Sequence, residues 1–374
     1  MRDAKARDDV DAAVIDTATL TRWLADTLAP GSAIRLLSTA VPATGYSALT
    51  MLIDAEIVNG GAGAVHSLVL RLEKPGQHVF FDTDVARQGQ MMRALGNFDM
   101  PVPRVLGIET DPAVLGGKFL VMERVEGVSL PQSPCYHVAG LLTELDDGGR
   151  CQLWNDAIST IARINRLDWN QGFGFLDRSR YGKPGLGQYL GWLSAWRDEA
   201  MAGAADPVID RAMARLTAEQ PFNHHVDVLW GDSNPGNYLF GRDGQVVAAL
   251  DFEAAALGPG EIDLAWWFFM DEMLSFGHQR QSGLPSREQQ IALYEAILGR
   301  RVEDLDYFEL LAAVRIALVI ARTANVLIEA GRLPPTNKTA HFNPAIQLLA
   351  TRLDMPDIDI GSHFAEFSQV MNSR

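Results

Sequence analysis

The sequence predicts an α+β chain with two unequal lobes: a small lobe with an antiparallel sheet and one main helix, then a larger, mainly helical lobe. Segments that alternate apolar and polar residues dominate the first part, and longer segments with helical periodicity follow from about residue 127. The chain has 374 residues, of which 47% are hydrophobic, which is ample for a sizeable core. We expect residues 1–125 to form the first lobe and residues 126–374 the second.

The expected first lobe begins with a helix through Leu28 that Thr17 or Thr19 could cap, after a charged start at residues 1–13. Strands are expected at 34–37, 48–55, 66–72 and 119–123, and a helix at 84–95. The turn 42–47 and the glycine-rich tip 59–63 would connect the first strands.

The expected second lobe is helical at 152–166, 186–202, 207–219, 287–298 and 304–330. Between these helices, residues 226–228 and 238–240 have the composition of short strands. Residues 241–244 form a predicted hairpin turn before a buried strand at 246–250.

The most informative motif combines residues 230–237, Trp-Gly-Asp-Ser-Asn-Pro-Gly-Asn, with residues 249–253, Ala-Leu-Asp-Phe-Glu. It places Asp232, Asn237 and Asp251 on one loop and hairpin. An Asp, an Asn five residues later and a second Asp about twenty residues further is the layout of a phosphoryl-transfer site. An ordinary acidic hairpin is the alternative, which the two apolar strands and the second Asp at this spacing disfavour.

In such a site Asp232 accepts or orients the proton of the substrate hydroxyl, because positioning dominates a loose phosphoryl transition state. Asn237 offers an amide oxygen and Asp251 a charged oxygen to Mg²⁺, which prefers oxygen ligands and keeps several waters. Glu253 is either a further ligand or a surface residue.

These motifs, with a downstream Asp263-Leu-Ala265, resemble the aminoglycoside phosphotransferase-like and choline-kinase-like branch of the protein-kinase-like fold. The pattern is most similar to the phosphotransferase domains associated with acyl-CoA dehydrogenases. The resemblance is specific in 226–267 and weaker over the rest of residues 30–350. It implies a bilobal fold, ATP and Mg²⁺ as cofactors, and a loop braced by Asp263.

The resemblance also implies a nucleotide site in the first lobe. Ser47, in the turn beside Gly45, would cover the phosphates. Val69 and Arg71 share one face of strand 66–72, where Val69 would cover adenine and Arg71 would contact phosphate; a solvated Arg71 is the alternative, and Lys74 is a weaker substitute. The backbone carbonyl of Glu123 and the N–H of Val125 would pair with adenine at a hinge near 123–127.

The chain departs from the family pattern at two positions. Gln88 stands where a Glu normally pairs with the cation on the strand, so the expected partner of Arg71 adds no charge. Trp230 replaces a His that usually anchors the catalytic loop, and we interpret it as a packing substitute. Similarly, Asn165 stands where a His is common, and we assign it no chemistry.

Other polar residues have less specific interpretations. Arg315, Arg322 and Asn325 share similar faces of helix 304–330 and either meet an anionic substrate or, as we favour, bond helix ends and loops. His224 and His225 with Asp227 could bind a metal, an interpretation that we disfavour.

Charge and composition limit the classes of partner and the cellular location that we expect for this chain. The net charge of −15 argues against nucleic acid or an anionic membrane as the main partner. No apolar run approaches the roughly 18 residues of a membrane span. The start is charged and lacks the apolar core of a secretory signal, and Cys135 and Cys151 are too few for a disulfide framework. We therefore expect a cytoplasmic protein.

The sequence thus predicts a phosphotransferase that moves the γ-phosphoryl group of ATP to a hydroxyl of a small molecule, with the acceptor and the oligomeric state undetermined. The first alternative is a pseudokinase, a nucleotide-binding module without turnover, which Gln88 and Trp230 favour. The second, a protein kinase, is disfavoured because only a short segment with Gly258-Pro-Gly260 follows Asp251.

Overall fold

The computed structural model describes residues 15–42, 48–59, 62–73, 79–222 and 224–372. The chain forms two compact units. The first contains the described part of residues 1–78 with 84–96 and 103–125, and the second contains 79–83, 97–102 and the described part of 126–374. Two short segments of the predicted first lobe, 79–83 and 97–102, thus pack with the second unit.

The first unit is built on a five-stranded antiparallel sheet in the order β1-β2-β3-β5-β4. Its elements are α2 (Thr17–Leu28), β1 (Ala33–Ala40), β2 (Ala48–Asn59), β3 (Ala62–Glu73), α3 (Val85–Gly96), β4 (Val105–Glu109) and β5 (Phe119–Glu123). Strands β2 and β3 pair along their whole length from Ala48↔Glu73 to Asn59↔Ala62, as expected for a tight hairpin. The predicted small antiparallel sheet is confirmed, and the edge strand β4 is an addition.

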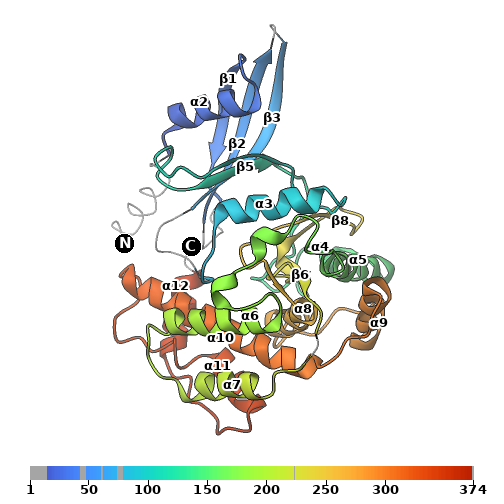
Figure 1. Cartoon of the computed structure of the whole chain (residues 1–374), viewed down its shortest axis with the longest axis vertical. Helices are drawn as coiled ribbons and strands as arrows, with labels where there is room; N and C mark the ends of the chain where they lie inside the picture. Colours follow the sequence, from blue (N-terminus) through green and yellow to red (C-terminus); the bar gives the residue numbers. More distant parts are fainter. Residues whose placement is uncertain (1–14, 43–47, 60–61, 74–78, 223, 373–374) are drawn as a thin grey trace. The chain divides into compact units, whose positions relative to one another are not determined.

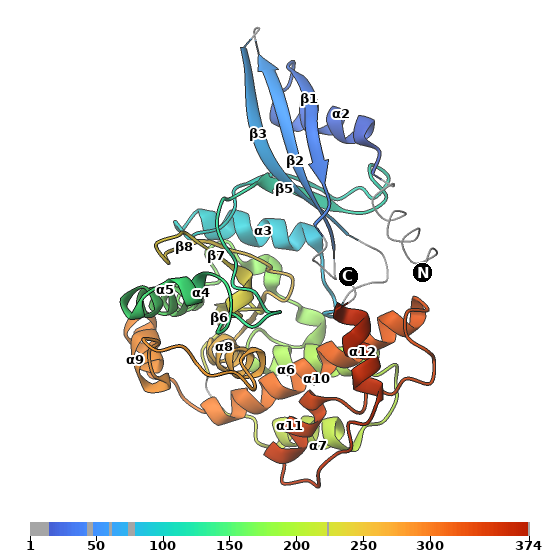
Figure 2. The same ribbon diagram turned by 180° about the vertical axis from the view of Figure 1, so that it is seen from behind.

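The two faces of this sheet are covered by different helices. Leu68, Leu70 and Leu72 belong to one apolar cluster with Leu20 and Leu24 of α2, which lies beside β1 and β2 (Figure 1 and Figure 2). On the opposite face, a side chain at Gly89 of α3 would lie 2.8 Å from Ile108 and 3.5 Å from Leu120, so α3 packs closely there. Alternation along β3 places Val69 and Arg71 on this second face.

The N-cap residue of α2 lies one residue before the first expected cap, Thr17. Asp16, and neither Thr17 nor Thr19, is the N-cap residue, because its carboxylate accepts hydrogen bonds from the N–H groups of Ala18 and Thr19. A carboxylate at this position satisfies two of the amide groups that a helix start leaves unpaired.

The second unit is mostly helical. Its helices are α4 (Leu141–Glu144), α5 (Asp147–Asn165), α6 (Leu186–Ala200), α7 (Pro207–Ala218), α8 (Glu261–Leu274), α9 (Arg287–Leu298), α10 (Leu305–Glu329), α11 (Pro344–Arg352) and α12 (His363–Asn372). Two short antiparallel pairs lie among them: β6 (Asp227–Leu229) with β9 (Ala256–Gly258), and β7 (Tyr238–Phe240) with β8 (Val246–Ala249). The α+β fold class predicted from the sequence is confirmed.

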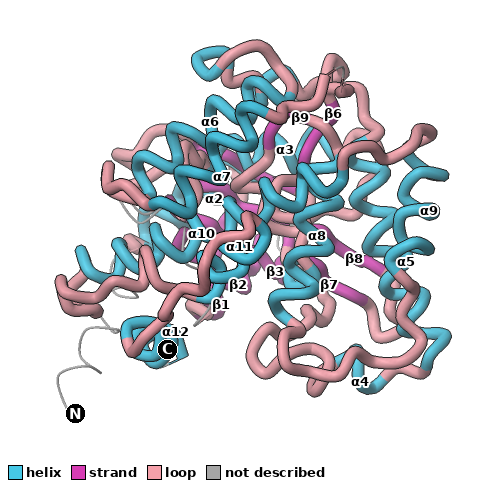
Figure 3. Tube along the Cα trace, turned by 90° about the horizontal axis from the view of Figure 1, so that it is seen from below, coloured by secondary structure: helices cyan, strands magenta, loops and turns pink. Residues whose placement is uncertain are grey.

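Helix α10 is the central helix of the second unit. It packs against α6, α7, α8 and α11 (Figure 3). By length and composition it could span a membrane, with a mean hydropathy of 1.8 over 18 residues, so the sequence expectation that no segment approaches such a span is wrong on this criterion. Because 67% of that window is buried inside the structure, α10 has the character of a core helix.

Candidate active site

The loop that follows β6 begins with a glycine that no other residue could replace without strain. Gly231 has φ +88°, and a Cβ there would lie 2.1 Å from the carbonyl oxygen of Ala254. Only glycine combines this left-handed conformation with so close an approach of two backbone segments. Gly231 therefore sets the direction in which the chain leaves β6 toward Asp232.

Asp263, in the first turn of α8, holds the same loop through hydrogen bonds. Its fully buried carboxylate accepts hydrogen bonds from the backbone N–H of Trp230 at 2.7 Å and of Gly231 at 2.9 Å. The hydroxyl of Ser233 donates to the Asp263 carbonyl at 2.9 Å. Three bonds between one residue and one loop confirm that Asp263 braces the loop.

Asn165, at the end of α5, supports this brace. Its amide nitrogen donates to the Asp263 carboxylate at 2.8 Å and to the Val228 carbonyl at 2.9 Å, and its amide oxygen accepts from the Tyr294 hydroxyl at 2.8 Å. The residue is fully buried. Asn165 thus ties α5, β6, α8 and α9 together, a structural role that the sequence did not reveal.

Asp232 has a carboxylate held by three donors. One oxygen accepts from Asn234 at 2.9 Å and from the Trp266 indole at 2.8 Å, and the other accepts from the Asn237 amide at 2.7 Å. Burial of the carboxyl group raises the pKa of Asp232 above its usual value, and the negative charge of Asp251 raises it further, while these hydrogen bonds and the charge of Arg315 act in the opposite direction. A carboxylate with raised basicity and a fixed orientation is suited to accept a proton.

Asn237 is oriented by Asp232. Its amide nitrogen donates to both the carboxylate and the carbonyl of Asp232, at 2.7 Å and 2.9 Å. Because the nitrogen is engaged on this side, the amide oxygen is directed elsewhere. The Asn237 carbonyl accepts from the N–H of Leu250 at 2.9 Å, which brings the β8 end beside it.

Asp251 follows that contact by one residue and has φ +59°, a conformation that non-glycine residues seldom adopt. Such strain is retained where the surroundings fix a particular side-chain direction. The structure therefore brings Asp232, Asn237 and the segment that carries Asp251 into one site. Among the residues described, no group of three or more His, Cys, Asp or Glu side chains could hold a metal ion.

Trp230 does more than fill space. The side chain is fully buried against Tyr238 and Phe252, and its indole N–H donates to the Leu250 carbonyl at 2.9 Å. The indole thereby connects the catalytic loop to the segment that carries Asp251. The interpretation of Trp230 as a packing substitute alone is incomplete.

The long-helix residues have separate environments. Asn325 donates to the Ala200 carbonyl at 2.8 Å, and Arg322 pairs with Glu199 and Glu329. Arg315 donates to the carbonyl of Gly231 and is fully buried. These contacts agree with the favoured prediction that the three side chains bond helix ends and loops.

In the first unit, Val69 and Arg71 occupy the sheet face that α3 covers, and Gln88 is buried on α3. Arg71 is paired with Thr50 and Leu120 across the sheet. The sequence predicted that Arg71 and Gln88 lie on a strand and a helix that face each other, and this arrangement agrees with that prediction. A direct contact between Arg71 and Gln88 stays a prediction. Ser47 and Lys74 lie outside the described residues.

An ion pair that the sequence did not predict lies at the start of α3. The Lys118 ammonium is 2.8 Å from the carboxylate of Asp84, which also accepts from the N–H of Ala86 at 2.8 Å. Burial opposes ionisation of Asp84, but the hydrogen bond and charge of Lys118 outweigh it and lower the pKa of Asp84. The start of α3 is thus docked to the residue before β5.

Glu123 and Val125 lie at the end of the sheet. Glu123 is paired with Leu68, its N–H donates to the Arg104 carbonyl at 3.0 Å, and its carboxylate pairs with the Arg104 side chain. Val125 is the last residue of the first unit. Their backbone contacts with adenine stay a prediction.

Comparison with known proteins decides the family. The model of the phosphotransferase enzyme family, abbreviated APH, matches residues 44–304, well over half of the chain. The chain belongs to this family. The resemblance inferred from the Asp232, Asn237 and Asp251 pattern is therefore confirmed.

Individual relatives are more distant. Acyl-CoA dehydrogenase family member 11 of Homo sapiens is 26% identical over 237 residues, a match that covers 60% of this chain and 29% of the relative. A protein from Ralstonia eutropha, named as a candidate aminoglycoside phosphotransferase, has a TM-score of 0.63 at 20% identity, covering 96% of this chain and 99% of that one. A mutant aminoglycoside phosphotransferase in a ternary complex with AMP-PNP and hygromycin B has a TM-score of 0.52 at 16% identity, covering 90% and 97% of the two chains. The two solved structures show the shared kinase-like fold.

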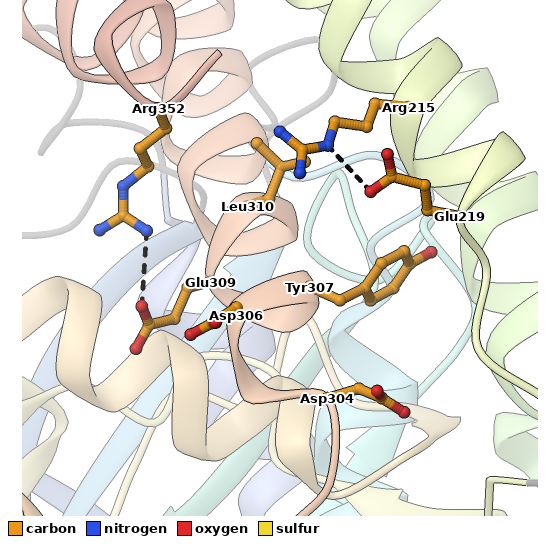
Figure 4. Close-up of a pocket in the computed structure, with 8 residues that line it drawn as sticks. All are labelled: Arg215, Glu219, Asp304, Asp306, Tyr307, Glu309, Leu310 and Arg352. Carbon is orange, nitrogen blue, oxygen red and sulfur yellow. Dashed lines mark hydrogen bonds and ion pairs between the residues drawn. The ribbon is translucent and has the colours of Figure 1, made fainter. Parts of the chain in front are cut away.

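A surface hollow of about 410 Å³ lies elsewhere on the second unit of this phosphotransferase-family chain (Figure 4). It is lined by residues of α7, α10 and α11 and of the segment before α10: Arg215, Glu219, Asp304, Asp306, Tyr307, Glu309, Leu310 and Arg352. None of the predicted site residues lines it. His224 pairs with Asp304 at 3.0 Å beside the hollow, while Asp227 binds Arg300, so the disfavoured metal site at His224, His225 and Asp227 gains no support.

Proposed function

We propose that this protein is an ATP- and Mg²⁺-dependent small-molecule kinase that transfers the γ-phosphoryl group to a hydroxyl of its acceptor. The observation that carries the proposal is the fixed arrangement of Asp232, Asn237 and the Asp251 segment on one braced loop and hairpin. Membership of the phosphotransferase enzyme family supports it. Residues 126–374 would form the catalytic and acceptor-binding lobe, and residues 1–125 the nucleotide-covering lobe.

Asp232 is the proposed catalytic base. The acceptor hydroxyl oxygen would attack the γ-phosphorus, the bond from that phosphorus to the bridging oxygen of ADP would break, and the hydroxyl proton would pass to the Asp232 carboxylate. The bonds from Asn234, Asn237 and Trp266 hold the carboxylate in one orientation before the acceptor binds. A preset orientation lowers the entropic part of the barrier.

Asn237 and Asp251 are the residues that would hold Mg²⁺. An amide oxygen directed away from Asp232 and a carboxylate at a strand end form an oxygen-only donor set, which suits Mg²⁺, and two protein ligands leave room for waters and phosphates. An ion held by these two residues would offset the negative charge of the ATP phosphates.

For the nucleotide, Arg71 is the proposed phosphate-binding cation, with Ser47 covering the phosphates and Gln88 orienting the guanidinium. Val69 would cover adenine, and the backbone of Glu123 and Val125 would pair with it. The AMP-PNP complex of a protein with the same fold supports an adenine nucleotide. We place the reaction in the cytoplasm, in keeping with two free cysteines, Cys135 and Cys151.

The acceptor would be a small molecule with a hydroxyl group. Hygromycin B in one structural neighbour and the acyl-CoA dehydrogenase name of one relative favour two acceptor classes, aminoglycosides and hydroxyacyl thioesters. Amino alcohols and sugars complete a useful screen.

A nucleotide-binding module without turnover is the second candidate. Gln88 favours it, because a neutral side chain stands where active kinases place a carboxylate. Trp230 no longer favours it, since the indole anchors the loop through a hydrogen bond.

Thermal-shift titrations with ATP and GTP, each with and without Mg²⁺, combined with an ATP-consumption assay, separate these candidates. Bound ligand stabilises the folded state in proportion to the logarithm of its concentration above Kd. The kinase predicts Mg²⁺-dependent stabilisation by ATP and ATP consumption that depends on the acceptor. Stabilisation without consumption under every acceptor would favour the binding module, and no response to either nucleotide would contradict both.

A further inference from the structure

Arg315 lies in the middle of α10, is fully buried, and contacts the loop that carries Gly231 and Asp232. Its guanidinium makes two contacts there. One nitrogen donates to the carbonyl of Gly231, and the guanidinium carbon lies 4.0 Å from the ring centre of Trp266, a cation–π geometry. Both contacted residues are neighbours of Asp232, one in sequence and one in space.

The Gly231 carbonyl belongs to the peptide group that leads into Asp232. That peptide is therefore held by Arg315, while the preceding peptide, which ends at the Gly231 N–H, is held by the Asp263 carboxylate at 2.9 Å. Fixing the planes of these two successive peptides fixes the backbone at Gly231 and the position of the Asp232 Cα atom. Arg315 and Asp263 thus clamp Gly231 from two helices, α10 and α8.

The second contact reaches the carboxylate of Asp232 itself. The Trp266 indole presents its face to Arg315 and donates its N–H to Asp232 at 2.8 Å. A cation on the face of a ring draws electron density from it and strengthens the N–H as a donor, since linked polar contacts polarise one another. One indole therefore connects the guanidinium to the proposed base.

Stability does not account for a guanidinium at this position. Two of its three nitrogens, Nε and Nη1, have no hydrogen-bond partner among the described residues, although all the side chain is buried. Burying a charge and leaving donors unsatisfied both cost free energy, and an apolar side chain of similar volume would avoid both costs. A buried polar group that is retained at such a cost calls for a role in function.

The charged and titratable groups around Arg315 and Asp232 come from four places. Asp251 faces Asp232 from the segment after β8, and Asp263 faces Arg315 and the loop from α8. The Tyr189 hydroxyl approaches Arg315 from α6, and Arg178 acts on the same hydroxyl. Of these two arginines, Arg315 is the one whose charge acts on both Asp232 and Asp263.

We propose that Arg315 is a positioning residue for phosphoryl transfer: it holds the Gly231–Asp232 peptide and, through the Trp266 indole, keeps the Asp232 carboxylate directed at the acceptor hydroxyl. The role in phosphoryl transfer rests on the proposed function, whereas the physical coupling of Arg315 to Asp232 does not depend on it. A merely structural Arg315 would lower stability without changing the hydrogen bond between the Trp266 indole and Asp232.

The test observes Asp232 directly through its neighbour. Of the eight indole N–H signals expected in a ¹H–¹⁵N spectrum, the one lost in W266F belongs to Trp266, and its ¹H shift at a fixed pH reports the bond to Asp232 if D232N moves it. In R315M we expect this signal to move toward its position in D232N, and in R315K to lie between those of R315M and the wild type. The control R322M removes an arginine two turns further along α10 that pairs with Glu199 and Glu329, and it should leave the signal unchanged.

Activity provides the second readout. R315M and R315K should lower kcat by roughly tenfold or more with KM for ATP nearly unchanged, because a charge-assisted hydrogen bond and the orientation of the base are lost. If R315M does not fold, the Trp266 signal and kcat of R315K decide. A Trp266 signal at the wild-type position in the folded Arg315 variants, or one that does not respond to D232N, overturns the inference. If the wild type consumes no ATP, the proposed function fails, and the Trp266 signal still decides whether Arg315 acts on Asp232.

Discussion

Replacing Asp263 with Asn should weaken the second unit and displace the catalytic loop. The Asp263 carboxylate accepts three hydrogen bonds, from Trp230 N at 2.7 Å, Asn165 Nδ2 at 2.8 Å and Gly231 N at 2.9 Å. An Asn of the same shape keeps one accepting oxygen and replaces the other with an NH₂ group. In its best orientation the NH₂ faces the N–H of Gly231, so two donors oppose each other and one bond is lost.

The size of the effect follows from these contacts. A buried N–H without a partner costs about 1–3 kcal/mol, and the two remaining bonds each weaken by about 1 kcal/mol when the acceptor loses its charge. Part of this loss is offset because the variant no longer buries a carboxylate, for which burial raises the pKa of Asp263 above its usual value. We expect a net loss of about 2–4 kcal/mol, compared with about 5–15 kcal/mol for a whole domain.

Scanning calorimetry measures this loss. At about 2–4 °C per kcal/mol for a unit of this size, the transition of the second unit should fall by on the order of 10 °C in D263N. The matched control is D243N, the same substitution at an exposed residue of the β7–β8 turn, which should change stability by less than about 0.5 kcal/mol. A D263N transition as close to the wild type as that of D243N would refute the argument that Asp263 braces the loop.

Three further predictions address the site. D251A should stay folded by circular dichroism yet lose the Mg²⁺-dependent part of its thermal stabilisation by ATP, because Asp251 lies at a strand end outside the apolar core; an unchanged Mg·ATP response counts against its assignment. W266F removes a hydrogen bond that lowers the pKa of Asp232, so the pKa of Asp232 should rise in this variant. Because the base acts when ionised, the variant should lose activity at a higher pH than the wild type as the solution is acidified. An acid limb of the kcat/KM profile at the wild-type pH would argue against Asp232 as the base. Q88E should raise kcat/KM for ATP modestly, because a charge-assisted bond to Arg71 contributes roughly 1.5–3 kcal/mol. Burial of the new carboxylate, at a position that is 3% exposed, offsets part of this gain. A lower kcat/KM would contradict the proposed pairing.

The parts of the fold that the sequence predicted are those determined by local pattern. Helices α3, α9 and α10 begin and end within about one residue of the expected ranges, because their apolar residues repeat with helical spacing. The β7–β8 hairpin was predicted from two apolar runs around the turn at Gly241–Gly244, and it carries the motif residues to their places.

The missed elements depend on distant partners. Strand β9 has three residues and forms only because β6, nearly thirty residues earlier, pairs with it. Strand β4 similarly completes the sheet edge beside β5. Segments this short carry too few residues for a periodic signal, and tertiary pairing decides their conformation.

The same division applies to the site. Asp232, Asn237 and Asp251 lie within twenty residues of one another, so their spacing alone predicted the cluster. Trp266 and Arg315 meet Asp232 and Gly231 from 34 and 84 residues away. The sequence singled out Arg315 as a residue that bonds a loop, but it did not identify Gly231 as the partner, and nothing near Trp266 distinguishes it from a core residue. Long-range hydrogen bonds of this kind require the folded structure.

The most direct test of the account is ³¹P nuclear magnetic resonance of ATP and Mg²⁺ with pools of amino alcohols, sugars, hydroxyacyl thioesters and aminoglycosides, comparing the wild type with D232N. The account predicts a new phosphoester signal and ADP in equal amounts with at least one pool, dependent on Mg²⁺ and slower by about a hundredfold or more in D232N. Equal rates for the two proteins would contradict Asp232 as the catalytic base. No phosphoester from any pool, with ATP still bound, would contradict phosphoryl transfer to these acceptors and favour the binding module.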